Sequence, residues 1–362
     1  MSVRRRRWIT RKRSSSCGPL GVLFGAVLAI AMTAVTASAT PPGGNGAIVF
    51  RRYFTSDHSS GALFVADLSG TAIKQITHPR RQRVLDTEPD WSPDGTRIAF
   101  QRNDRSGCGP NCETAEIWVV DADGRNATAI AKDPRSKGCA NHDRAAGGFC
   151  RGDPAWSPDG KRIIFACGTL PTATKPETER FCVTAADGSK LTRLPSPPRG
   201  AQDYGPQWSP NGNKIAFERR LVSRTGETLR TAIFVMNSDG SDARRITPWP
   251  LRGGDHPDWS PDGRTILFRS NHEGSDRITG NLYVVRPDGT ALRQLTRARG
   301  GVVQHLSSSF SPDGRWITFA KTPGKGRAGN ADVFVMRADG TGIRNVTRSA
   351  IWDSAPDWGS GR

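Results

Sequence analysis

Side chains that could bind a ligand recur at one place in this chain of 362 residues, a few positions before each copy of a Trp-Ser-Pro-Asp-Gly sequence. They are carboxylates, imidazoles and one phenol: Asp86, Glu88, Asp153, Asp203, Tyr204, Asp255, His256, His305 and Asp353. Carboxylates and imidazoles that converge can bind a divalent cation, or orient a sugar or a peptide. The structural alternative is that these groups form hydrogen bonds to neighbouring loops and strand ends.

The spacing of the five-residue sequence indicates what must position these side chains. Full or near copies begin at Trp91, Trp156, Trp208 (with Asn211 for Asp), Trp259 and Phe310 (with Phe for Trp), and a truncated copy surrounds Trp358. The intervals are 65, 52, 51, 51 and 48 residues. A repeat of about 50 residues built from short strands is typical of a β-propeller blade. We therefore interpret the repeated aromatic residues as structural, each packing between neighbouring blades.

Each repeat predicts four antiparallel strands. The first strand ends at the Trp, and Ser-Pro-Asp-Gly is a turn because Pro fixes φ, Asp bonds nearby backbone and Gly adopts a positive φ. The second strand carries a Phe, and an Asp-Gly hairpin joins the third strand to the fourth. Residues 46–77 contain strands two to four of a blade, whereas residues 354–358 contain only a first strand. We expect these two segments to build one blade together, giving an all-β, six-bladed closed ring without exposed sheet edges.

These motifs resemble the TolB-like propeller repeat. The resemblance rests on the Trp-Ser-Pro-Asp-Gly turn, the second strand with its Phe and the Asp-Gly hairpin, and it covers residues 45–360. It implies a six-bladed propeller, which in TolB is the C-terminal domain of a periplasmic protein and binds partner proteins. TolB has an α/β domain before its propeller, but only residues 40–45 precede the first predicted strand here. We therefore do not expect this chain to be TolB itself.

The N-terminal segment has the features of a secretory signal peptide. Residues 1–39 combine a basic start, an apolar run over 20–35 and the triplet Ala37-Ser38-Ala39. An uncleaved membrane anchor is the alternative, and the export route, Sec or twin-arginine, stays open. We expect a leader over 1–39, a linker over 40–45 and the propeller over 46–362. The mature protein would be periplasmic, envelope-associated or secreted.

The charge of the chain argues against nucleic acid as a partner. Removing the seven basic residues of 1–39 lowers the formal net charge from +18 to +11. The remaining Arg and Lys side chains are scattered through the repeats, whereas nucleic-acid binding needs a clustered basic stripe. We expect a monomer with an envelope protein, a peptide or a polysaccharide as its partner, touching a membrane only through an uncleaved N-terminus.

Six cysteines follow the leader: Cys108, Cys112, Cys139, Cys150, Cys167 and Cys182. An even number in an exported protein favours disulfides. Cys167 closes one predicted strand and Cys182 opens the next, which predicts a cross-strand bridge. The pairs 108–112 and 139–150 each share a loop. A zinc site is the alternative interpretation.

Binding is expected on one face of the propeller. The two short, uniform turn types lie on one face, and the variable connections, which contain all six histidines, lie on the other. The chain lacks a Gly-x-Ser-x-Gly nucleophile motif. We predict a non-catalytic binding scaffold without a cofactor, in which Asp255 and His305 can be replaced without loss of stability. Two alternatives are a purely structural envelope module and a hydrolase or lyase acting on carbohydrate at the channel mouth, where a divalent cation can assist.

Overall fold

The structure is a computed structural model that describes residues 44–105, 114–131, 149–169, 178–223, 227–270, 280–298, 305–323 and 330–361. The chain divides into two units, Met1–Val35 and Thr36–Arg362, and all described residues lie in the second. The leader predicted over 1–39, Cys108, Cys112, Cys139 and the side chain of Cys150 lie outside the described residues. Within the described ranges, no helix is long and apolar enough to span a bilayer.

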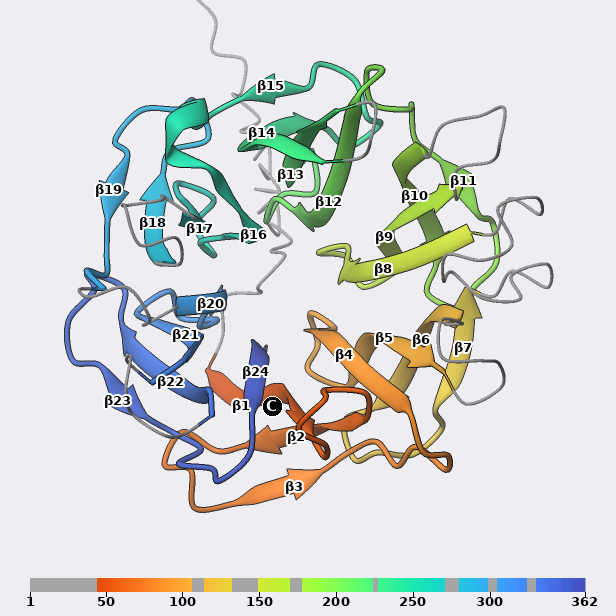
Figure 1. Cartoon of the computed structure of the whole chain (residues 1–362), viewed down its shortest axis with the longest axis vertical. Helices are drawn as coiled ribbons and strands as arrows, with labels where there is room; N and C mark the ends of the chain where they lie inside the picture. The colour runs from red at the N-terminus through yellow and green to blue at the C-terminus, as the bar shows by residue number, and fades with distance from the viewer. Residues whose placement is uncertain are drawn as a thin grey trace, which may run out of the picture. The chain divides into compact units, whose positions relative to one another are not determined.

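The described strands pair in antiparallel groups of four (Figure 1). One group is β24 (Asp353–Ser360), β1 (Asn45–Tyr53), β2 (Gly61–Ala66) and β3 (Ile73–Gln75). The next is β4 (Val84–Trp91), β5 (Arg97–Asp104), β6 (Thr114–Asp121) and β7 (Thr128–Ala131). Then follow β8 (Phe149–Trp156), β9 (Arg162–Thr169), β10 (Thr178–Ala185) and β11 (Thr192–Arg193). The fourth group is β12 (Ala201–Trp208), β13 (Lys214–Val222), β14 (Thr228–Asn237) and β15 (Arg244–Arg245). A short 3-10 helix, η1 (Trp249–Leu251), leads to β16 (Gly253–Trp259), β17 (Ile266–Ser270), β18 (Asn281–Val285) and β19 (Arg293–Gln294). The last group is β20 (His305–Phe310), β21 (Trp316–Lys321), β22 (Asp332–Arg337) and β23 (Arg344–Asn345).

The first and last described strands share a sheet. β24 pairs antiparallel with β1, with Ile48 opposite Trp358 and Val49 opposite Asp357. This is the pairing that the sequence predicted for the strand around Trp358. The first two groups join into one eight-stranded sheet through a parallel pair, Gly61 and Leu85, and each of the others is a separate four-stranded sheet.

Six strands, β4, β8, β12, β16, β20 and β24, line the centre of this unit, and we call them the inner strands (Figure 1). They contact one another in that order, and β24 also contacts β4. Five of them end at a repeated aromatic residue, which is Phe310 in β20 and Trp in the other four, whereas β24 continues past Trp358 to Ser360. The outer strands β11, β15, β19 and β23 have only two residues each, which limits the exposed sheet edge.

The Ser-Pro-Asp-Gly turns owe their shape to hydrogen bonds from the Ser and the Asp. Ser92 Oγ donates to Asp94 Oδ1 at 2.7 Å and accepts the N–H of Arg97 at 2.8 Å. Asp94 Oδ1 also accepts the N–H of Thr96 at 3.0 Å, and Gly95 has a φ of 64° that favours glycine. The same Ser pattern recurs at Ser157, Ser209, Ser260 and Ser311. One side-chain set thus fixes the entry into five of the second strands, β5, β9, β13, β17 and β21.

The repeated Trp side chains pack between neighbouring groups. Trp156, which is 1% exposed, lies in a cluster with Ala99 and Ile117 of the preceding group and Phe165 of its own. Its backbone N–H also donates to Asp90 of the preceding group at 2.7 Å. A ring buried on both sides removes apolar surface of two groups from water at once, which stabilises their contact.

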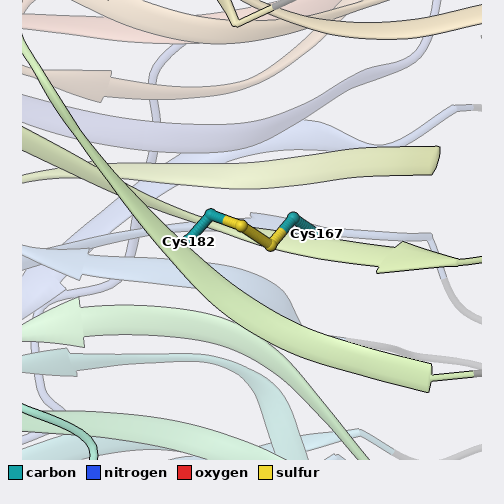
Figure 2. The surroundings of a disulfide bond; sticks show 2 residues. All are labelled: Cys167 and Cys182. Carbon is teal, nitrogen blue, oxygen red and sulfur yellow. A yellow bond between two sulfur atoms is a disulfide. The ribbon is translucent and has the colours of Figure 1, made fainter. Parts of the chain in front are cut away.

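A disulfide joins Cys167 in β9 to Cys182 in β10 (Figure 2). Cys167 lies opposite Arg180 in the register of the two strands, so the bridge runs diagonally between them. The sequence predicted this bridge, but it placed Cys182 at the start of a strand. Cys182 instead lies in the middle of β10, because that strand begins at Thr178.

Candidate functional site

The candidate site is a polar recess of about 310 Å³ beside the inner strands β8, β12 and β16. We call this recess and Glu88 beside it the mouth. The side chains of the recess are Asp153, Tyr204, Glu218, Arg220, Asp255, His256 and Arg269. Four of these seven residues belong to the set singled out from the sequence. The mouth lies on the side of the variable connections, because the Ser-Pro-Asp-Gly turns follow the opposite ends of the inner strands.

A bend in each inner strand positions the mouth residues. Glu88, Asp153 and His256 each lie three positions before the repeated Trp, and they have φ values of 47°, 53° and 49°. The pairing register shifts at each of these points, as in a β-bulge. Ser307 and Ala355 have the same kind of backbone at the equivalent positions of their strands. The bend therefore belongs to the scaffold, and only the side chains it carries differ from group to group.

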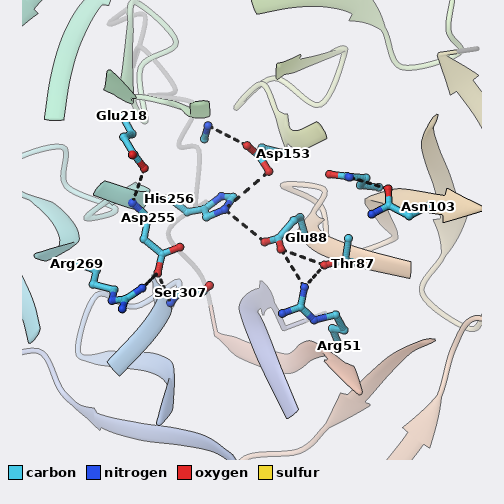
Figure 3. Close-up of polar contacts among 12 residues, drawn as sticks. Arg51, Thr87, Glu88, Asn103, Asp153, Glu218, Asp255, His256, Arg269 and Ser307 are labelled. Carbon is cyan, nitrogen blue, oxygen red and sulfur yellow. Dashed lines mark hydrogen bonds and ion pairs between the residues drawn. The ribbon is translucent and has the colours of Figure 1, made fainter. Parts of the chain in front are cut away.

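Glu88, Asp153 and His256 point toward one another from three different groups (Figure 3). His256 Nε2 lies 3.5 Å from Glu88 Oε2 and 3.8 Å from Asp153 Oδ1. Burial disfavours the charged ring, but the carboxylates around it, Asp153 and Glu88 above all, raise the pKa of His256 to about 9. Burial raises the pKa of Asp153, while His256 lowers it. We call these three residues the mouth triad.

Arginine side chains surround the triad. Arg51 Nη1 donates to Glu88 Oε1 at 3.2 Å, and Arg51 Nη2 donates to Ser354 at 2.7 Å. On the other side, Arg269 Nη1 lies 3.3 Å from Asp255 Oδ2. Burial opposes ionisation of Asp255, but Arg269 and His256 outweigh it and hold the pKa of Asp255 below its ordinary value. The mouth therefore alternates positive and negative groups.

Glu218 ties the mouth together, and the sequence analysis did not single it out. Its Oε2 accepts the backbone N–H of Asp255 at 2.8 Å, and its Oε1 lies 2.6 Å from Arg220 Nε. Glu218 and Arg269 both follow the Phe of a second strand by one residue, as Arg51 does. This shared position in the repeat is the sequence feature from which Glu218 and Arg269 could have been predicted to lie near the mouth.

Three other residues of the predicted set are held by arginines of their own groups. Each carboxylate accepts two hydrogen bonds of 2.6–2.8 Å from one guanidinium, and all three are nearly or fully buried. The pairs are Arg102 with Asp86, Arg219 with Asp203 and Arg52 with Asp353. Such bidentate pairs fix two adjacent strands of one sheet. These carboxylates do not join the mouth triad.

Tyr204 and His305 complete the predicted set. The Tyr204 hydroxyl donates to Gln202 at 2.9 Å, and the Arg220 guanidinium lies 4.2 Å from the centre of its ring. His305 is 3% exposed, and its Nδ1 is 3.0 Å from the carbonyl oxygen of Gly280. Burial lowers the pKa of His305 to about 4. His305 is thus a buried strand residue, and its replacement should cost stability, contrary to the expectation from sequence.

Beside the triad lie three carboxylates that sequence reasoning missed, of which Asp258 is buried and Asp90 and Asp357 are partly buried. A narrow cavity of about 50 Å³ is lined by the triad and also by Asp90, Asp258 and Asp357. Each accepts a backbone N–H of a repeated aromatic residue in the next group, at 2.6–2.7 Å. Burial raises the pKa of all three, that of Asp258 to about 8. The sequence Pro-Asp-Trp, which occurs at these three inner strands, is the feature from which the three carboxylates could have been predicted.

The triad is built to hold one positive charge. With a pKa of about 9, His256 is protonated at neutral pH, and a protonated imidazole cannot act as a general base. The same carboxylates can hold a cation of another kind when His256 gives up its proton, because a lone positive charge beside two carboxylates is stabilised. The geometry therefore fits binding of an amine, a guanidinium or a metal ion.

Comparisons with known proteins agree with this fold. No family model matches the chain. It is similar to a TolB homolog of Chlorobium luteolum, 29% identical over 178 residues that cover 49% of this chain and 36% of the relative. It is also similar to dipeptidyl-peptidase 5 of Porphyromonas endodontalis, 32% identical over 128 residues that cover 34% of this chain and 17% of the relative. The chain thus spans only a minor part of the length of these curated relatives.

The likeness to a solved structure extends over most of the chain. TolB from Acinetobacter baumannii superposes with a TM-score of 0.61 at 18% identity, covering 87% of this chain and 67% of that one. At this identity the likeness concerns the fold alone. The repeated turn, the antiparallel groups of four strands and these likenesses together support a TolB-like β-propeller fold for the chain.

Proposed function

We propose that the six groups of strands form a closed six-bladed propeller. Two observations support this: the cycle of contacts among the inner strands, and the pairing of β24 with β1, which supplies that group with its first strand. Closure would leave no long sheet edge exposed. The mouth would then surround the central axis, and the variable connections would form a rim around it.

We propose that the chain is an exported, non-catalytic binding protein whose mouth receives a positively charged group of a protein partner. The observation that carries this proposal is the mouth triad, in which carboxylates from two groups hold the imidazole of a third as a cation. A Lys or Arg side chain, or an N-terminal amine, offers the same charge with more hydrogen-bond donors. Export is part of the proposal and rests on the sequence of residues 1–39.

A ligand cation at the triad would compete with the proton on His256. The arginines in and around the mouth already lie against carboxylates: Arg51 against Glu88, Arg220 against Glu218 and Arg269 against Asp255. Two positive charges beside the same pair of carboxylates repel each other, so the ligand should bind best when His256 is neutral. Affinity for a Lys or Arg side chain, which stays charged over this range, should therefore rise as the pH rises toward about 9.

Site-directed photo-crosslinking in the producing organism tests this proposal. A crosslinking amino acid at Gln202, beside the mouth, should give a discrete adduct with an envelope protein. The double substitution Glu88→Gln with Asp153→Asn should abolish the adduct while the far-ultraviolet circular dichroism stays unchanged. Asp262→Asn on the turn face is the matched control and should leave the adduct intact. An adduct that persists in the double variant would overturn the proposal.

We propose a metal-assisted hydrolase or lyase acting on carbohydrate as the second candidate. The observation that favours it is that one ligand atom each from Glu88, Asp153 and His256 lie within 4.8 Å of one another. Two carboxylates and an imidazole suit a divalent ion such as Zn²⁺ or Mn²⁺. Calorimetric titration with both ions, on the wild type and on His256→Asn, tests the ion site. Product release from acidic oligosaccharides that depends on the ion would favour this candidate over the first.

A further inference from the structure

The packing between groups repeats a cation over a ring. Arg97, which begins the second strand of one group, has its guanidinium carbon 4.7 Å from the ring centre of Trp156 in the next. Arg162 lies 4.8 Å from the ring centre of Trp208 in the same way. Contacts of this kind add a specific attraction to the burial of the ring. Lys214 occupies the equivalent place in the sequence of the group before Trp259.

At one junction both members of this pair are smaller. Thr265 stands where the Arg or Lys would be, and Phe310 stands where the Trp would be. The two exchanges remove a guanidinium and one ring of an indole from the same place. At the two remaining junctions the second-strand residue is Ala47 before Trp91 and Trp316 before Trp358, so both of these junctions keep the Trp. The change at both positions is thus confined to the contact between the β16–β19 group and the β20–β23 group.

A recess of about 570 Å³ lies at this junction. Thr265 and Phe310 line it, together with two prolines of the turns, Pro261 and Pro312. Val284 adds a buried apolar wall. The volume falls within the range of small-molecule sites. Since the turns form part of its wall, the recess lies on the turn face, away from the mouth.

We propose that this recess binds an indole-sized aromatic ring. The missing indole ring and guanidinium define the space, and the apolar wall and the proline rings offer the surface against which a flat ring packs. Arg293, which is exposed and also lines the recess, supplies a cation for the face of the ring, as Arg97 does for Trp156. The ring belongs either to a free small aromatic molecule or to an aromatic side chain of a protein.

Binding of two probes to the full chain tests this proposal. Indole represents the free molecule, and N-acetyl-tryptophanamide represents the side chain. Ligand-observed NMR and calorimetry should give a dissociation constant of about 1 mM or lower for at least one probe. Thr265→Arg combined with Phe310→Trp restores the repeat pair and should weaken binding by about tenfold or more, because it fills the space. Lys214→Arg makes the same kind of change at a junction that keeps its Trp, and it should leave binding unchanged.

The two probes distinguish the sources of the ring. Binding of indole alone would assign the recess to a small aromatic molecule, and binding of both would admit a protein side chain. If the filled variant does not fold, as judged by circular dichroism, Ala338→Leu narrows the recess from another wall and should weaken binding in its place. The proposal is overturned if neither probe binds at about 10 mM, or if a folded variant with a filled or narrowed recess binds as the wild type does. None of these outcomes depends on the mouth.

Discussion

The charge on His256 should respond to the two carboxylates that face it. Its pKa is raised from 6.5 to about 9, against the effect of burial. Glu88→Gln combined with Asp153→Asn keeps the size of both side chains but removes their charges. Only the more weakly acting carboxylates Asp255 and Glu218 then oppose the effect of burial, so the pKa of His256 should fall from about 9 toward its ordinary value.

The magnitude follows from the size of the shift. A rise from 6.5 to about 9 corresponds to about 3 kcal/mol of free energy of unfolding. The His256 side chain is 32% exposed, so solvent screening should reduce the measured value to about 1–2 kcal/mol. Because the folded pKa lies above the unfolded one, this stability is complete below pH 6.5 and is lost as the pH rises through about 9.

Two measurements check this reasoning. NMR titration of labelled histidines should show one ring, absent from His256→Gln, that titrates near pH 9 in the wild type and much lower in the double variant. Between about pH 6.5 and about pH 10, the free energy of unfolding in urea should fall more for the wild type than for His256→Gln. Other titrating groups contribute equally to both proteins, so the difference between the two losses reports on His256 alone. A His256 ring that titrates near pH 6.5 in the wild type would refute the electrostatic account of the mouth. His305 is the internal control, since burial should keep it neutral down to about pH 4.

Three further predictions concern the scaffold. Trp358→Ala should destabilise the protein by about 3–5 kcal/mol in urea unfolding, because the ring is 2% exposed and its Nε1 donates to the carbonyl of Gly46 at 3.2 Å. Asp203→Leu should lower the free energy of unfolding by about 3–5 kcal/mol, because it leaves the buried Arg219 without its partner. Adding Arg219→Met should recover most of this loss, and failure to recover it would contradict the ion-pair interpretation. Replacing the cysteines of the 167–182 disulfide by Ser should lower the free energy of unfolding by about 3 kcal/mol, since the bridge closes a loop with a sequence separation of 15. Equal melting temperatures of the wild type with and without reductant would argue against the bond.

The architecture was predictable because each local signal depends on neighbouring residues. The turn at Ser92 is made by side chains within five residues of it, so its chemistry can be read from five letters. The pairing of the strand around Trp358 with the strand around Ile48 was also predictable, since a first strand missing at one end is present at the other. The diagonal bridge from Cys167 to Cys182 followed from the placement of adjacent strands, even though one strand boundary was wrong.

The composition of the mouth was only partly predictable, because it depends on a bend in the strand. Asp86 and Glu88 lie two residues apart, and in a regular strand they would share one face. The register shift between Thr87 and Asp90 and the positive φ of Glu88 separate them, so that Arg102 holds Asp86 while Glu88 reaches His256. A signal for the arginine pairs did exist: Arg102 and Arg219 each lie 16 residues after their Asp. The bulge at Glu88 has no sequence pattern of this kind, apart from the Pro that follows it.

In a chain built from repeats, the positions that depart from the repeat are those that the scaffold does not require. The bend three residues before each Trp forms with Glu88, with Ser307 and with Ala355 alike, so the carboxylate of Glu88 is not needed for the bend. The same reasoning applies on the turn face, where the junction of Thr265 and Phe310 lacks a cation and a ring that other junctions have. Replacing Glu88 and Asp153 should therefore keep the fold and remove binding at the mouth, at the cost of the charge stabilisation of His256. Thr265→Arg with Phe310→Trp should keep or raise stability while removing binding at the recess. If the variants at both places failed to fold, these departures would instead compensate for local packing, and departure from the repeat would not by itself point to binding at either place.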